Sequence, residues 1–192
     1  MSQLRLSQEP AADDLLSSDP FALLVGMLLD QQVPMERAFA GPLRLVERMG
    51  TDRLDPRAVA AAGPEEFAAL MAGPPAVHRY HGSMAARVQA LARAVVEDYG
   101  GDVTSLWTSA GTGQELRARL QALPGFGPQK AKIFTALLGK QLGVCPPGWR
   151  EAAEEYGADG VHRSVADVRD PESLAAVREH KRMLKAEVRG AS

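Results

Sequence analysis

The stretch LRARLQALPGFGPQKAKIFTALL, residues 116–138, predicts two helices joined by a tight turn. Leu116 and Leu120 recur at helical spacing before the turn, and apolar residues recur again after it. Between the two helices, Gly125-Phe126-Gly127 can adopt unusual dihedral angles while the phenylalanine packs inward. The sequence therefore predicts a helix-hairpin-helix motif over residues 113–141.

This hairpin lies in a basic segment that contains no acidic residue. Residues 116–150 carry six Lys and Arg side chains and no Asp or Glu, although the whole chain has a formal charge of −2. A local excess of one sign is typical of a polyanion contact. Because Gly127 begins a helix, its N–H groups and dipole favour an anion, and Lys130 and Lys132 follow directly. We therefore favour a DNA phosphate here over two alternatives, a plain helix corner and a solvated helix face.

The remaining sequence predicts further helices and no strand. Several helix starts are marked by an aspartate cap followed by proline, as at Asp19-Pro20 and Asp55-Pro56. Gly41-Pro42 predicts a break or kink within one helix. The predicted helices cover residues 20–32, 35–49, 56–62, 64–71, 84–99, 113–122, 128–141, 149–156 and 171–189. The expected fold class is therefore all-α.

Composition sets limits on the kind of protein. Hydrophobic residues make up 45% and charged residues 24%, which is typical of a globular protein. The chain has one cysteine, Cys145, and no Cys/His cluster, so we expect no iron–sulfur cluster and no internal disulfide. The N-terminus lacks the apolar core of a signal peptide, and no apolar run approaches the roughly 20 residues of a membrane span. We expect a soluble, monomeric, cytoplasmic protein associated with the nucleoid.

The hairpin residues Leu123-Pro124-Gly125-Phe126-Gly127 resemble the LPG-x-G hairpin of the helix-hairpin-helix (HhH-GPD) superfamily of base-excision DNA glycosylases. That superfamily includes endonuclease III and the 3-methyladenine glycosylases. Residues 19–32, DPFALLVGMLLDQQ, are similar to the family's early helix, and residues 81–107 are similar to the helix that precedes its hairpin. These segments occur in family order over most of residues 19–141.

The resemblance implies a single two-lobed domain over residues 1–192 that binds double-stranded DNA and flips a damaged base into a cleft. One lobe would cover residues 20–110, and the other residues 111–192 together with the N-terminal residues. The phosphate contacts would come from Gly125, Gly127, Gln129, Lys130 and Lys132. The carbonyls of Gln121, Leu123 and Phe126 would hold a structural K⁺ or Na⁺. Gln31 and Gln32 would approach the flipped nucleotide, although by themselves they also fit an exposed polar helix end.

Two family positions are not matched. Bifunctional members form a Schiff base through a lysine two residues after the second hairpin glycine, and here that residue is Gln129. Lys130 lies about 100° further around the helix, so we expect it to contact phosphate and expect no lyase activity. The family's aspartate after the second hairpin helix is also missing, because residues 144–149 contain no carboxylate. We select Asp30 as the substitute catalytic carboxylate, with an ordinary exposed aspartate as the alternative.

Other polar residues are weaker candidates. Asp159 and Asp167 follow the unmatched position, and Cys145 lacks an evident base partner. His78 and His81 lie in a predicted loop that could line the cleft, although loop histidines more often face solvent.

Three functions fit these residues. The first is a monofunctional DNA N-glycosylase without lyase activity. The second is a non-catalytic module that binds DNA or a lesion, since neither catalytic family position is matched. The third, a helical scaffold that binds a protein through the hairpin, is disfavoured by the basic segment.

Overall fold

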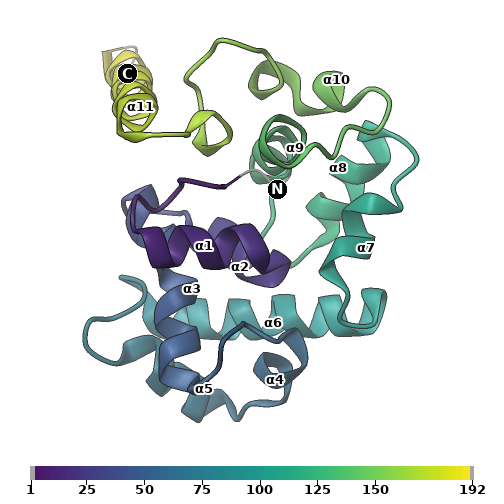
Figure 1. Ribbon diagram of the computed structural model, residues 1–192. Coiled ribbons are helices and arrows are strands. Elements are labelled where there is room, and N and C mark those ends of the chain that lie inside the picture. The colour runs from purple at the N-terminus through teal and green to yellow at the C-terminus, as the bar shows by residue number, and fades with distance from the viewer. Residues whose placement is uncertain (1–2, 191–192) are drawn as a thin grey trace.

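The computed structural model describes residues 3–190, so residues 1–2 and 191–192 of the predicted domain lie outside the described part (Figure 1). Within residues 3–190 the structure contains helices and no strand, which confirms the all-α prediction. The helices are α1 (Pro10–Ser18), α2 (Pro20–Leu29), α3 (Met35–Met49), α4 (Pro56–Ala61), α5 (Pro64–Ala72), α6 (His81–Tyr99), α7 (Val103–Thr108), α8 (Gly113–Ala122), α9 (Pro128–Leu142), α10 (Trp149–Ala153) and α11 (Pro171–Gly190), with the short 3₁₀ helices η1 (Glu154–Tyr156) and η2 (Val165–Asp167).

Helix α2 is the centre of the first group of helices. Every residue from Phe21 to Leu29 is buried, because α1, α3, α6 and α7 pack around it. Its N-terminus is held by Asp19, whose carboxylate accepts hydrogen bonds from Phe21 N–H and Ala22 N–H at 3.0 Å and from Leu54 N–H at 2.6 Å. This cap joins the start of α2 to the segment that leads into α4.

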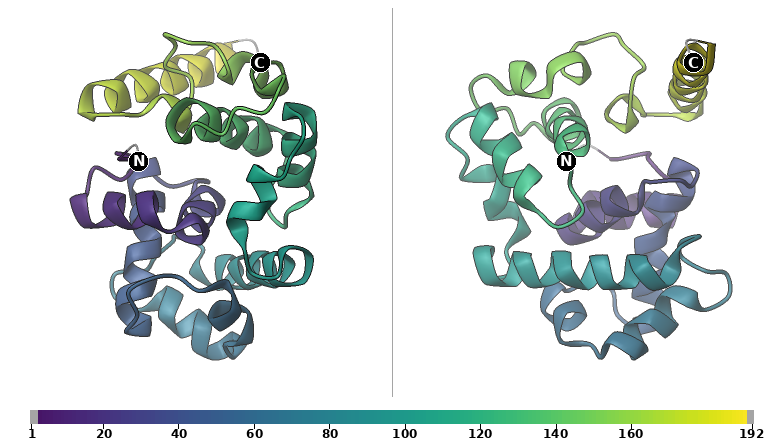
Figure 2. Two further views of the ribbon diagram at one scale, coloured as in Figure 1. Left: turned by 45° about the vertical axis from the view of Figure 1, so that its right-hand side comes forward. Right: turned by 180° about the vertical axis from the view of Figure 1, so that it is seen from behind.

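A second group of helices carries the hairpin. Helices α8, α9 and α10 pack against one another, and α9 also packs on η2 (Figures 1 and 2). The long helix α6 packs on α4 and α5, and α7 connects it to α8. Helix α11 packs on η2 and lies at the same end of the molecule as α9 and α10 (Figure 2).

Several predicted boundaries need correction. Of the predicted break or kink at Gly41-Pro42, the break is wrong, because α3 continues through both residues. Both residues are buried, and a Cβ at position 41 would lie only 2.7 Å from Leu29 Cδ1, so close packing holds the helix together there. The helix expected over residues 149–156 is divided into α10 and η1. Helices α1 and α7 were not predicted, since each is short and lacks a long amphipathic pattern.

Candidate DNA-binding cleft

The hairpin turn is pressed against the end of α2. Gly125 has φ +83°, a left-handed conformation, and a Cβ there would lie 2.3 Å from Leu28 Cδ1. Both the backbone conformation and the close approach therefore require glycine. Phe126 is 3% exposed and meets Phe134 edge-on, with ring centroids 6.0 Å apart. The predicted inward packing of Phe126 is confirmed, and it fixes the turn on the core.

The second glycine has a different environment. Gly127 caps α9 with φ −77°, an ordinary value, and a Cβ there would have no neighbour within 4 Å. Packing and backbone strain within residues 3–190 thus give no reason for a glycine at this position. No hydrogen bond joins the backbone N–H groups of Gly125, Gly127 and Gln129 to another described residue. These groups are available to an anion at the start of the helix.

Acidic residues from elsewhere in the chain neutralise most of the basic segment. Among the described residues, Glu154 pairs with both Arg117 and Lys132, at 2.8 and 2.6 Å, and six other residues form the pairs Arg119–Glu115, Lys140–Asp167 and Arg150–Asp159. Lys130 is the member of the segment without an ion pair in residues 3–190. The acid-free segment of the sequence is therefore not a free basic patch of six charges. Lys132, a predicted phosphate contact, is engaged by Glu154.

A cavity of about 1020 Å³ lies between the end of α2, the start of α9, and α11. The residues that line it include the predicted Asp30, Gln31, Gln32, Gly125, Gly127, Gln129 and Lys130. It is also lined by Tyr156, Arg163, His180, Lys181 and Lys185, which were not predicted at this site. The structure therefore brings the predicted nucleotide-facing glutamines, the hairpin and the substitute carboxylate together in one cleft.

Asp30 lies in this cleft between two cations. Helix α2 ends at Leu29, earlier than predicted, so Asp30 is its C-cap and Gln31 and Gln32 continue as a loop. The surrounding protein displaces water from the carboxylate and raises its pKa, while the positive charges of Lys181 and Lys130 oppose that rise. The alternative interpretation, an ordinary exposed aspartate, does not fit this environment.

Lys130 reaches into the protein from the first turn of α9. Its Nζ donates a hydrogen bond to the Leu28 carbonyl at 3.0 Å and lies 5.9 Å from the centre of the Phe126 ring. Burial lowers the pKa of Lys130 from 10.5 to about 8, with Asp30 favouring the charged amine and Arg87 opposing it. The amine is thus a titratable cation between the hairpin and Asp30.

The loop after Asp30 is held by a buried histidine. His78 Nε2 lies 3.0 Å from the Gln31 carbonyl, and His78 Nδ1 accepts a hydrogen bond from Tyr80 N–H at 3.0 Å. These contacts assign the neutral ring with its proton on Nε2. Burial lowers the His78 pKa, and hydrogen bonds to the Gln31 and Leu29 carbonyls oppose this. The expectation that His78 faces solvent is wrong, because the loop folds inward against α2.

The remaining predicted residues of the hairpin are Gln129 and the three residues whose carbonyls were expected to bind a monovalent cation. Gln129 Nε2 donates to the Tyr156 hydroxyl at 3.0 Å, across the cavity lining. The Leu123 carbonyl accepts from Phe126 N–H at 3.1 Å, whereas no described N–H group donates to the carbonyls of Gln121 or Phe126. Two of the three carbonyls expected to hold a monovalent cation therefore keep their lone pairs free of the described chain.

The weaker carboxylate candidates lie outside the cleft. Asp167 is buried against Lys140, 2.6 Å away, and accepts hydrogen bonds from Arg163 N–H and Ser164 N–H. Asp159 is 75% exposed in its side chain and pairs with Arg150. Each carboxylate therefore has an ion-pair partner within the protein and does not face the cleft. Cys145 is exposed, and the described residues contain no group of three His, Cys, Asp or Glu side chains placed to hold a metal ion.

Comparisons with known proteins agree with this arrangement. None of the helices in residues 3–190 has the length and apolar character needed to cross a membrane. A search of curated proteins found no match. The family model described as "HhH-GPD superfamily base excision DNA repair protein" matches residues 25–184, which include the second half of α2, the hairpin and most of α11. Proteins of this superfamily bind DNA and act in base excision repair. The chain therefore belongs to the HhH-GPD superfamily of base excision DNA repair proteins.

Proposed function

We propose that this protein is a monofunctional DNA N-glycosylase that flips a damaged base out of a duplex and hydrolyses its bond to the sugar. The observation that carries the proposal is the position of Asp30, which lines the same cavity as Gly125, Gly127 and Lys130. A cavity of about 1020 Å³ has room for an extruded nucleotide.

The chemistry requires a carboxylate that is ionised and shielded from water. Departure of the base leaves positive charge on the sugar, and an ionised carboxylate beside it stabilises that charge. Burial around Asp30 strengthens such an interaction but also raises the pKa of the carboxyl group, and the charges of Lys181 and Lys130 oppose that rise only in part. Positive charge that develops on the sugar would further favour the ionised form. Asp30 therefore takes the role of the carboxylate that is missing from residues 144–149.

The DNA backbone is held at the hairpin, which lies against the end of α2 next to Asp30. The N–H groups of Gly125, Gly127 and Gln129 contact phosphate at the start of α9, and Lys130 adds a charge beside them. Gln31 and Gln32 approach the nucleotide or the gap that it leaves. A K⁺ or Na⁺ held by the carbonyls of Gln121, Leu123 and Phe126 would neutralise the orphan carbonyls at the end of α8; the open carbonyls of Gln121 and Phe126 support this assignment.

We infer that the enzyme leaves an intact abasic strand. An amide such as Gln129 is not a nucleophile toward the sugar. The amine of Lys130 is directed toward the Leu28 carbonyl, to which it donates a hydrogen bond at 3.0 Å, and not toward the position of the family's nucleophile at residue 129.

The test is a panel of duplexes, each with one damaged or mismatched base, incubated with the purified protein and then heated in alkali. Alkali cleaves the strand wherever a base has been removed, so release is detected without lyase activity. We expect strand cleavage at one class of lesion, and no cleavage in samples that are incubated with the protein but not heated in alkali. Lesion-selective binding without any base release would instead establish the second candidate function, a non-catalytic lesion-binding module, which the two unmatched family positions favour.

A further inference from the structure

Helix α11 has a second half that the rest of the described chain leaves uncovered. Leu174 and Val177, in its first turns, are buried in the core, whereas every residue from Arg182 to Gly190 is exposed. Within residues 3–190 this half contributes little to the core, yet Leu184 and Lys185 line part of the cleft. Its position therefore calls for an explanation other than folding.

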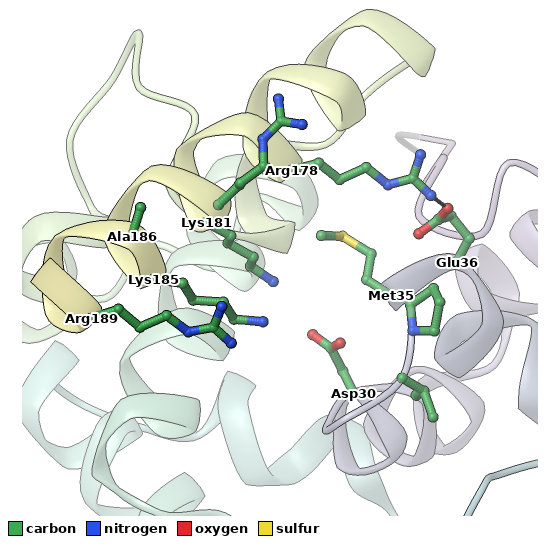
Figure 3. Close-up of a pocket in the computed structure, with 11 residues that line it drawn as sticks. Asp30, Met35, Glu36, Arg178, Lys181, Lys185, Ala186 and Arg189 are labelled. Atoms are coloured by element: carbon green, nitrogen blue, oxygen red, sulfur yellow. Dashed lines mark ion pairs between the residues drawn. The ribbon is translucent and has the colours of Figure 1, made fainter.

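The side of α11 that faces the cleft is strongly basic. A second cavity of about 630 Å³ separates α11 from the loop between α2 and α3, and α11 lines it with Arg178, Lys181, Arg182, Lys185 and Arg189. The acidic residues that line this cavity are Asp30 and Glu36. In Figure 3, Lys181 and Lys185 extend toward Asp30, while Arg178 reaches across to Glu36.

Ion pairs account for only part of this charge. Arg178 pairs with Glu36, and Arg182 pairs with Glu179 on the same helix. Lys181, Lys185 and Arg189 form no ion pair with any residue between 3 and 190. Like charges four residues apart on a helix repel one another and destabilise it. A polyanionic ligand would relieve this repulsion, and three cations without an ion pair on the side that faces a cavity favour such a ligand.

The spacing of the stripe suits a nucleic-acid strand. Three residues at four-residue intervals extend over about 12 Å along the helix. One strand of duplex DNA carries a charge about every 3.4 Å along its axis, so the stripe spans about three phosphates. Lys181 and Lys185 line both cavities, which makes the stripe continuous with the cleft that contains the hairpin.

We propose that Lys181, Lys185 and Arg189 form a second phosphate-binding face, so that the strand with the flipped nucleotide is held by the hairpin on one side of the cleft and by α11 on the other. The inference rests on the proposed function only for the position of the flipped nucleotide. Contact between α11 and the DNA backbone requires DNA binding alone, which the family already establishes.

The test compares the wild type with a Lys185→Ala/Arg189→Ala double variant in duplex binding at several salt concentrations. Lys181 is left intact because it lies beside Asp30. Each lost phosphate contact lowers the slope of log K against log salt by about 0.9, so we expect a slope shallower by about 1.8. Both substituted residues are exposed, so the thermal unfolding midpoint should stay unchanged.

A matched control removes two exposed cations away from the cleft, as in Arg53→Ala/Arg93→Ala. Both double variants lose the same net charge, so only a specific contact separates them. An equal change in slope for the two variants would overturn the proposal, and so would tighter binding by the α11 variant, which would identify α11 as a lid over the cleft.

The choice of duplex separates this proposal from the proposed function. The salt slope is measured on an undamaged duplex and requires no base release, so it tests α11 independently of any chemistry at Asp30. If no duplex in the panel ever loses a base while the slope still changes, the phosphate-binding face stands and the glycosylase proposal fails.

Discussion

Gly125 and Leu28 are in direct contact, although they are 97 residues apart in the sequence, and a Cβ on Gly125 would lie 2.3 Å from Leu28 Cδ1. This contact joins the hairpin to the end of α2, where Asp30 follows two residues later. It therefore sets the distance between the phosphate-binding turn and the candidate carboxylate. The same turn contains a second glycine with no such neighbour, which allows the two roles to be separated.

We predict that alanine at the first hairpin glycine lowers stability, whereas alanine at the second weakens DNA binding. Gly125→Ala combines a steric clash with a left-handed backbone and should lower the free energy of unfolding by about 2 to 4 kcal/mol. Gly127→Ala should change stability by less than about 1 kcal/mol, since its Cβ enters open space. It should nevertheless weaken DNA binding by about tenfold or more, because a methyl group obstructs phosphate approach. Urea unfolding and fluorescence anisotropy measure the two effects, and unchanged binding by folded Gly127→Ala would contradict the assignment.

We predict that Asp30→Asn loses base release and keeps DNA affinity. The lost electrostatic stabilisation of the transition state is about 3 to 4 kcal/mol, which corresponds to a hundredfold or greater loss in rate. Single-turnover assays on the cleaved lesion measure the rate. The control is Asp52→Asn, an exposed aspartate outside the cleft. Wild-type release by Asp30→Asn would show that another group performs this role.

We predict that DNA affinity decreases as the pH rises from 7 to 9. The Lys130 amine has a pKa of about 8 and loses its positive charge over this interval, so one phosphate contact weakens. A several-fold loss of affinity is expected from one charge-assisted hydrogen bond. Lys130→Arg remains charged throughout and should largely remove this pH dependence. An equal decline in the arginine variant would assign the effect to another group.

We predict that protonation of His78 lowers the free energy of unfolding at acidic pH. Burial lowers its folded pKa below the unfolded value of about 6.5, so the unfolded chain takes up the proton first. The free energy of unfolding should therefore be highest above pH 6.5 and should fall as the pH decreases below that value.

The matched variants for this prediction are His78→Ala and His162→Ala. The first removes two buried hydrogen bonds and should cost about 2 kcal/mol at pH 7 while weakening the pH dependence. The second, at an exposed histidine, should leave both properties close to wild type. Chemical denaturation at pH 5, 6 and 7 distinguishes them.

We predict that borohydride traps no covalent adduct between the protein and a substrate duplex. Gln129 cannot form an imine, and the Lys130 amine is held by its hydrogen bond to the Leu28 carbonyl. Denaturing gel electrophoresis after reduction detects any adduct. An adduct that disappears in Lys130→Ala would show that this amine acts as a nucleophile after all.

Much of the fold was predictable because it depends on local pattern. The apolar spacing on both sides of the glycines predicted α8 and α9, and the aspartate–proline starts predicted α2 and α4. Pro42 does not end α3, although proline usually ends a helix, since tertiary packing of α3 outweighs the missing backbone hydrogen bond. Within the site, Asp30, Gln31 and Gln32 were selected from the sequence, whereas Lys181 and Lys185 were not.

The sequence by itself determined the helical class, the hairpin with its two glycines, and the absence of a carboxylate after α9, because each depends on residues close together in the chain. Only the tertiary structure decided how the charges are distributed. It placed Glu154 against Arg117 and Lys132, buried Asp167 against Lys140, and left Lys130 without an ion pair among the described residues. It also placed Asp30 near Lys130 and Lys181, which lie about 100 and 150 residues further along the chain. Electrostatic energy depends on distance in space and on exclusion of water, and neither quantity can be read from the order of residues.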